Sequence, residues 1–113
     1  MFGKNQKQEP ADLHFFNIFD TKVGCYQREP MLAINDHDML RQLDGLMRDP
    51  SQEKNQYVTN AEDFQLFQVG SYWKKTSTLQ GCEPRHIANL HEIKAAARAQ
   101  KTGPSGLMGI AST

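Results

Sequence analysis

The chain has 113 residues and a formal net charge of zero, and 38% of its residues are hydrophobic. This length suits one domain with a modest core and leaves no room for a second. No stretch approaches the roughly 18 uncharged apolar residues of a membrane-spanning helix, and no apolar run follows the N-terminal lysines as in a signal peptide. We therefore expect neither membrane insertion nor secretion.

The charges are unevenly distributed along the chain. Residues 1–70 hold seven Lys and Arg against eleven Asp and Glu, whereas residues 71–113 hold six against two. A polyanion meets the local basic surface of a protein and not its average charge. The second half is therefore the place to look for a phosphate-bearing partner, and a chance asymmetry is the alternative.

Polar residues dominate both ends of the sequence. Residues 1–12 have little apolar content, and residues 101–113 are rich in Gly, Ser and Thr around a short apolar island at 107–110. Both compositions are typical of flexible segments. We expect a flexible arm over 1–12, a single domain over 13–100, and a flexible tail over 101–113 whose island is a candidate docking peptide.

The domain is predicted to begin with two strands. The aromatic run 13–19 ends at a segment, 20–24, that contains the turn formers Asp, Thr and Gly. An extended segment follows over 25–34 and is interrupted by Pro30. Because proline lacks a backbone N–H, this second strand should lie at a sheet edge or carry a bulge at Pro30.

The clearest helix follows the candidate N-caps Asn35 and Asp36. It should end at Asp49-Pro50, because the residue before a proline is pushed out of the helical region. An apolar stripe with helical spacing runs along this segment. Such a stripe usually faces a core, and a stripe that binds a partner is the alternative. Residues 51–60 are predicted to form a polar loop. The stripe consists of Met39, Leu40, Leu43, Leu46 and Met47.

Two further strands and a second helix complete the predicted order. Residues 63–73 are strand-like with a bulge or bend at Gly70, and 74–81 should fold back as a weaker fourth strand. Pro84 suits the first turn of a second helix that ends near Gln100. The order β-β-α-β-β-α predicts an α+β fold, with a small antiparallel sheet of three to four strands packed on one or two helices. The apolar stripe of the second helix is Ile87, Leu90, Ile93 and Ala97.

The basic second half contains the ingredients of a surface for single-stranded nucleic acid. Aromatic rings stack on bases at about 1–3 kcal/mol each, and lysines pair with phosphates. In the alternative interpretation, one of the two neighbouring aromatics plugs the core and the lysines only protect a sheet edge. The candidate nucleic-acid-binding residues are Tyr72, Trp73, Lys74, Lys75, Arg85, Lys94, Arg98 and Lys101.

The sequence offers no credible metal or catalytic site. Cys82, His86 and His91 have zinc-binding side chains, but a helical i, i+5 pair points its imidazoles about 140° apart, and no Cys-x2-Cys partner exists. Neither Cys25 nor Cys82 lies near a strained elbow or an oxyanion loop, and no glycine-rich phosphate loop is present. We therefore expect a non-enzymatic protein without metal or cofactor, with both cysteines reduced as in a cytosol.

Four segments resemble the small nonstructural protein of gokushoviruses, which are microviruses with single-stranded DNA genomes. Residues 18–26 are similar to the family's Phe-Asp-Ser-Lys-x-Gly-x-Tyr. Residues 61–72 are similar to its Pro-Glu-Asp-Tyr/Phe-x-Leu-Phe-x-x-Gly-x-Tyr/Phe, the most specific piece. The proline and apolar residues before the first helix, and the helix-like segment after Pro84, complete the match. The resemblance covers roughly residues 13–95.

This resemblance implies a nonstructural phage protein that acts in viral DNA replication, at the switch to single-stranded DNA synthesis and packaging. It implies no enzymatic activity and assigns no catalytic or binding residue. We expect a non-enzymatic accessory protein of the bacterial host cytoplasm that binds single-stranded viral DNA, or the replication complex that carries it. The alternative is a protein-interaction module that docks on the viral replication initiator or a host replication protein without binding DNA. A homodimer would cover the edges of so small a sheet.

Overall fold

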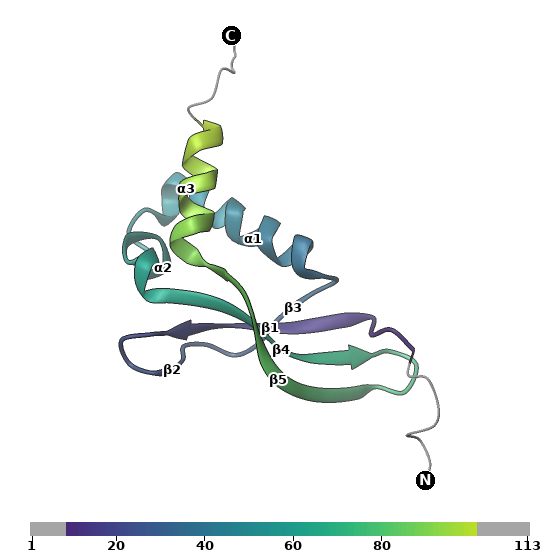
Figure 1. The fold of residues 1–113 in the computed structure, drawn as a ribbon. Helices are drawn as coiled ribbons and strands as arrows, with labels where there is room; N and C mark the ends of the chain where they lie inside the picture. Colours follow the sequence, from purple (N-terminus) through teal and green to yellow (C-terminus); the bar gives the residue numbers. More distant parts are fainter. Residues whose placement is uncertain (1–8, 102–113) are drawn as a thin grey trace.

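A five-stranded antiparallel sheet carries the helices of the protein on one face (Figure 1). The computed structural model describes residues 9–101. The α+β fold predicted from the sequence is confirmed. The strands are β1 (Leu13–Asp20), β2 (Cys25–Tyr26), β3 (Met31–Ala33), β4 (Phe64–Trp73) and β5 (Thr78–Asn89). The helices are α1 (Asp36–Arg48), α2 (Gln56–Thr59) and α3 (Leu90–Lys101), with 3-10 turns at η1 (Pro50–Gln52) and η2 (Ala61–Asp63).

The strand order in the sheet is β2-β1-β4-β5, and β3 pairs with β1 beside β2. The predicted second strand is thus split in two, and both pieces lie at the sheet edge, where the proline between them is tolerated. Asn17 bridges the gap between the pieces, because its Nδ2 donates to the carbonyl oxygen of Arg28 at 2.6 Å.

The turn between β1 and β2 is closed by local hydrogen bonds. Oδ1 of Asp20 accepts from the backbone N–H of Lys22 at 2.9 Å and of Val23 at 3.3 Å. Gly24 has a φ of 82°, a left-handed conformation that glycine adopts without steric cost. The turn predicted over 20–24 is therefore confirmed.

α1 begins and ends where the sequence predicts. The Asn35 side chain accepts from the backbone N–H of Asp38 at 2.8 Å, and the helix stops before Pro50. Asp49 then caps η1, where hydrogen bonds from Ser51 lower the pKa of the Asp49 carboxyl. The apolar stripe of α1 faces the core, through the buried side chains of Met39, Leu43 and Met47.

The prediction of a polar loop over 51–60 is wrong for the second half of that segment. α2 forms there and buries Tyr57 and Val58. The Asn55 side chain caps α2 by accepting from the backbone N–H of Tyr57 at 2.9 Å. The Tyr57 ring packs on Phe64, with ring centroids 4.8 Å apart. Two apolar residues among polar ones are too short a pattern to reveal a helix.

The start of the last helix also differs from the prediction. β5 continues past Pro84 to Asn89, and α3 begins only at Leu90. Pairing with β4 keeps the segment extended, because Asn89 lies opposite Gln65 and Arg85 lies opposite Gln68. The proline is accommodated because β5 is an edge strand and the register shifts beside it. The predicted stripe keeps its buried members Leu90, Ile93 and Ala97, whereas Ile87 belongs to the strand.

The core lies between the sheet and the helices. We call the helix-covered side of the sheet the inner face and the opposite side the outer face. Within residues 9–101 no helix covers the outer face (Figure 1). Nor is any helix in this range long and apolar enough to cross a membrane. The largest fully buried side chains belong to Phe16, Ile18, Met39, Leu66 and Leu90.

Most of the predicted arm and tail lies outside the described residues, and so does the apolar island at 107–110. The end of the arm that the structure describes follows the end of β4. Asp12 donates its backbone N–H to the carbonyl oxygen of Tyr72 at 2.9 Å. Its Oδ2 accepts from the backbone N–H of Lys74 at 2.7 Å. Residues 9–12 are thus attached to the sheet.

Candidate nucleic-acid interface

The eight residues predicted to bind nucleic acid do not form one surface. The run 72–75 lies at the hairpin end of β4 and β5, whereas the last three cations belong to α3 (Figure 1). This hairpin end and α3 are on opposite sides of the molecule in that view. Of the α3 cations, Arg98 is exposed and Lys101 is the last residue of the helix.

Arg85 holds three elements together. Its Nη2 forms an ion pair with Asp36 Oδ1 at 2.8 Å and donates to Gln68 Oε1 at 2.7 Å. These contacts join β5 to the first residue of α1 and to β4. The guanidinium is therefore satisfied within the chain.

Lys94 also has a partner inside the protein. It is half-buried, and its Nζ donates to the carbonyl oxygen of Val58 at 2.8 Å. A helix end leaves carbonyl groups without partners inside the helix, and this contact satisfies one at α2. Lys94 therefore supports the packing of α3 on α2.

Tyr72 and Trp73 point to opposite faces, as alternation along a strand requires. Tyr72 lies opposite Leu13 of β1 and Leu79 of β5, on the outer face. Trp73 lies on the other side, where its Nε1 donates to the carbonyl oxygen of Glu9 at 2.6 Å. Both side chains are half-buried, so neither is a plug of the core.

Four aromatic rings on the outer face were missed by the sequence prediction. Phe19 of β1 contacts Tyr26 of β2 and Phe67 of β4 edge-on, with ring centroids 5.0 and 6.1 Å apart. Phe67 also contacts Tyr26 and His86 of β5, at 6.0 and 5.4 Å. The rings thus form one row of contacts across four strands. We call these four residues the aromatic cluster.

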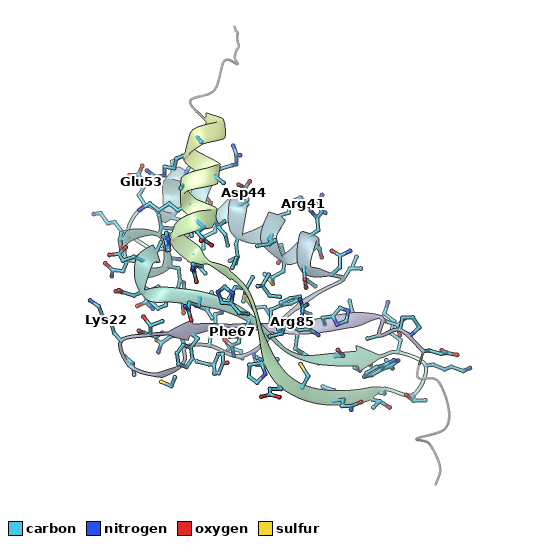
Figure 2. All side chains as sticks on the ribbon, viewed as in Figure 1. Lys22, Arg41, Asp44, Glu53, Phe67 and Arg85 are labelled. Atoms are coloured by element: carbon cyan, nitrogen blue, oxygen red, sulfur yellow. The ribbon has the colours of Figure 1, made fainter. Side chains whose placement is uncertain are left out.

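The aromatic cluster is accessible from solvent. Tyr26 is 36% exposed, His86 is exposed, and Phe19 and Phe67 are half-buried. Figure 2 shows ring side chains gathered around Phe67 on the side of the sheet that faces away from α1 and α3. Aromatic side chains that share one solvent-accessible face of a sheet are candidates for a binding surface.

A second apolar region of the outer face lies between the aromatic cluster and the hairpin end. A shallow hollow of about 230 Å³ opens there, next to Phe15 of β1. Leu79 and Leu32 border this region, and these residues are 66% and 48% exposed. We call the hollow and these two leucines the apolar patch. The hollow is lined by Phe15, Pro30, Val69, Gly70, Leu79, Gln80 and Gly81.

Cationic side chains lie at the two ends of the sheet. Lys74 and Lys75 are exposed in the turn between β4 and β5. Lys22 is 74% exposed in the turn between β1 and β2, and its Nζ lies 3.5 Å from a carboxylate oxygen of Asp63. The aromatic cluster thus lies towards the β1–β2 turn, and Lys74 and Lys75 lie at the opposite end of the sheet.

Comparison with known proteins places the chain among phage proteins. The family model of Phage ORF5 proteins matches residues 13–93. The chain belongs to the Phage ORF5 protein family. A search of curated proteins and a search of solved structures each return no match. The matched range begins at β1 and ends inside α3, so it includes all four rings of the aromatic cluster.

Membership of the Phage ORF5 family agrees with the broad part of the sequence resemblance, namely that this is a phage protein. Within residues 9–101, no three His, Cys, Asp or Glu side chains gather as metal ligands. His86 Nε2 donates a 2.9 Å hydrogen bond to Asn89 Oδ1, whereas His91 belongs to α3. Cys25 and Cys82 are free and exposed.

The outer face of this Phage ORF5 protein combines the aromatic cluster with the apolar patch. The outer face offers ring surfaces and apolar contacts to a flat ligand, and the exposed cations Lys74 and Lys75 lie at its hairpin end. Bases provide flat apolar surfaces and phosphates provide negative charge. A single nucleic-acid strand combines these two properties.

Proposed function

We propose that this Phage ORF5 protein is a non-enzymatic accessory protein that binds single-stranded DNA through the outer face of its sheet. The observation that carries the proposal is the aromatic cluster, with four rings in edge-on contact on a face that no described helix covers. Stacking of bases on such rings tolerates any sequence, because every base has a flat π-face. Exposed rings lose water-accessible apolar area when bases cover them, which favours binding.

The proposal reassigns some of the predicted binding residues. Tyr72, Lys74 and Lys75 remain in the binding surface, because they lie on the outer face or in the turn that ends it. Arg85 and Lys94 are assigned to folding, since both are satisfied by partners within the chain. The proposed binding surface therefore contains fewer cations and more aromatic rings than the set predicted from the sequence.

We further propose that the protein serves a single-stranded DNA phage of the gokushovirus type, within the Microviridae. Its place of action would be the host cytoplasm, at the switch to single-stranded genome synthesis and packaging. The phage family and the resemblance of segments 18–26 and 61–72 to the gokushovirus protein support this role. A protein that covers exposed bases suits a stage at which single strands accumulate.

Fluorescence anisotropy with a labelled single-stranded oligonucleotide tests the proposal. Wild-type protein should bind, and its affinity should fall as salt rises from about 50 to 200 mM, because phosphate contacts release counterions. Phe67→Ala should weaken binding about tenfold, since stacking on one ring contributes about 1–3 kcal/mol. Ile34→Ala is the matched control, because Ile34 is 62% exposed and lies outside the aromatic cluster. Equal affinity of the wild type and Phe67→Ala would contradict the proposal.

A second candidate function is docking of a protein, and the apolar patch favours it. The exposed leucines Leu79 and Leu32 offer an apolar contact without charge. The partner would be the viral replication initiator or a host replication protein. In that case Leu79→Ser abolishes co-purification with the partner, and the oligonucleotide does not bind at about 50 mM salt.

A further inference from the structure

We infer that a single strand follows the length of the outer face, from the aromatic cluster across the apolar patch to the turn between β4 and β5, where Lys74 and Lys75 contact its phosphates. This inference rests on the proposed function. It adds the path of the strand, the length of the site and the residues that end it.

Strand register makes the path continuous. Phe67 lies opposite His86 at one end of the outer face. Towards the hairpin, the next position on this face joins Phe15 of β1 to Gly70 of β4. The last position is the row of Leu13, Tyr72 and Leu79. Each row brings a ring or an apolar side chain to the same face, so bases find a contact surface along the whole path.

The middle of the path is open because two glycines lie opposite each other. Gly70 pairs with Gly81, so no side chain rises from β4 or β5 at that row. A Cβ at Gly70 would lie 2.8 Å from the carbonyl oxygen of Gln80, and the close approach of the strands therefore requires glycine there. The hollow of about 230 Å³ is several times the roughly 30 Å³ share of one water. It leaves room for a flat base beside Phe15.

Lys74 and Lys75, at the end of the path, form no ion pair with any residue in the range 9–101. Lys22 and Arg85, in contrast, each belong to an ion pair. The backbone N–H of Lys74 donates to the Asp12 carboxylate, and both Lys74 and Lys75 are exposed residues. The turn is therefore fixed by the backbone while both ammonium groups remain available to phosphates.

The length of the path sets the size of the site. Strands rise about 3.3 Å per residue, so Phe67 and Lys74 are separated by about 23 Å along β4. A stacked strand advances 3.4 Å per nucleotide, so this distance takes about seven nucleotides, and fewer if the strand is extended. A trinucleotide bound at the aromatic cluster is too short to reach the lysines.

The experiment compares dT3 and dT12 on the wild-type protein and on Lys74→Ala/Lys75→Ala. Affinities come from NMR titration for dT3 and from anisotropy for dT12. The double variant should bind dT12 about tenfold more weakly at about 50 mM salt, and its slope of log K against log salt should be shallower by about 1.4 for two phosphates. Its affinity for dT3 should equal that of the wild type.

A charge-matched control is available on the helix side. Arg41→Ala/Lys54→Ala removes two exposed cations away from the path and should leave both affinities unchanged. If the lysine variant binds dT12 with wild-type affinity and slope, the inference is overturned. The proposed function still stands in that case, provided that Phe67→Ala weakens binding. Failure of wild-type protein to bind dT12 would overturn both.

Discussion

Leu66 and Phe67 are neighbours in β4, but they belong to two very different surfaces. Leu66 is fully buried on the inner face, under the helices. Phe67 is half-buried on the outer face, in contact with rings from three other strands. Because side chains alternate along a strand, a single strand supplies both the core and the surface proposed to bind DNA. We therefore expect that stability and the proposed DNA binding can be altered separately in this sheet.

The cations on the helix side of the sheet differ from those at the hairpin end of β4 and β5. On the helix side, the side chain of Lys94 donates to a backbone carbonyl, and Arg85 pairs with Asp36 across elements. At the hairpin end, Lys74 and Lys75 are exposed without an ion pair within residues 9–101. Removal of Arg85 or Lys94 should lower the unfolding free energy. Removal of Lys74 and Lys75 should weaken the proposed binding of DNA.

The largest expected effect comes from Leu66→Ala. Truncation of a fully buried leucine removes apolar contacts and leaves a cavity, which costs about 2–5 kcal/mol of unfolding free energy. Chemical denaturation followed by far-UV circular dichroism measures it. The variant that remains folded should bind the oligonucleotide with wild-type affinity. A loss below about 1 kcal/mol would show that the inner face is not the close-packed core described here.

Gly70 and Gly81 lie opposite each other at the open row of the path, and their alanine variants should differ in stability. Gly70→Ala should lose about 1–3 kcal/mol of unfolding free energy, because its Cβ would meet backbone and the strands must separate. Gly81→Ala is the matched control, since its Cβ would lie 3.8 Å from the nearest atom, the carbonyl oxygen of Val69. Thermal unfolding of the two variants measures the difference. Equal stabilities would mean that the close approach at Gly70 is unimportant.

Phe67→Ala on the outer face should have the opposite balance of effects to Leu66→Ala on the inner face. Phe67→Ala should lose less stability than Leu66→Ala, because its ring is already partly in water. Its affinity for single-stranded DNA should fall about tenfold, in line with about 1–3 kcal/mol for one stacked base. Denaturation and anisotropy on the same preparation measure both quantities. If Phe67→Ala lost only stability, the outer face would be structural.

The smallest expected effect belongs to Lys94→Met. Loss of a partly solvated hydrogen bond to the Val58 carbonyl oxygen should cost about 1 kcal/mol of unfolding free energy. DNA affinity and its salt slope should not change, in contrast to the lysine pair at the hairpin end. A shallower salt slope for Lys94→Met would return Lys94 to the binding surface predicted from the sequence.

The features that the sequence predicted correctly are those set by neighbouring residues. Asp20 and Gly24 close their turn through contacts within four residues, and Asn35 caps the helix that it precedes. The bulge or bend predicted at Gly70 is likewise signalled by the one glycine inside the apolar strand β4, and the register of this strand shifts beside it, between Gln68 and Gly70. Such features can be predicted without knowledge of the fold, because the interacting residues are close together in the sequence.

The features that the sequence missed depend on distant partners. Pro84 is typical of a helix start, yet pairing with β4 holds the segment after it extended until Leu90. The aromatic cluster combines rings from four separate strands, so its existence depends on strand order and register. Arg85 and Lys94 count as basic residues in a sequence, whereas only the structure reveals their internal partners.

Mapping of the bound strand by NMR is the most direct test of the central claim, that the outer face binds single-stranded DNA. Amide and aromatic signals of labelled protein would be followed while dT12 is added. We predict that the largest shifts occur at Phe19, Tyr26, Phe67 and His86 and extend to Tyr72, while the side chains of Leu66, Met39 and Leu43 in the core stay unchanged. Shifts concentrated on α1 and α3, with the rings unaffected, would contradict it.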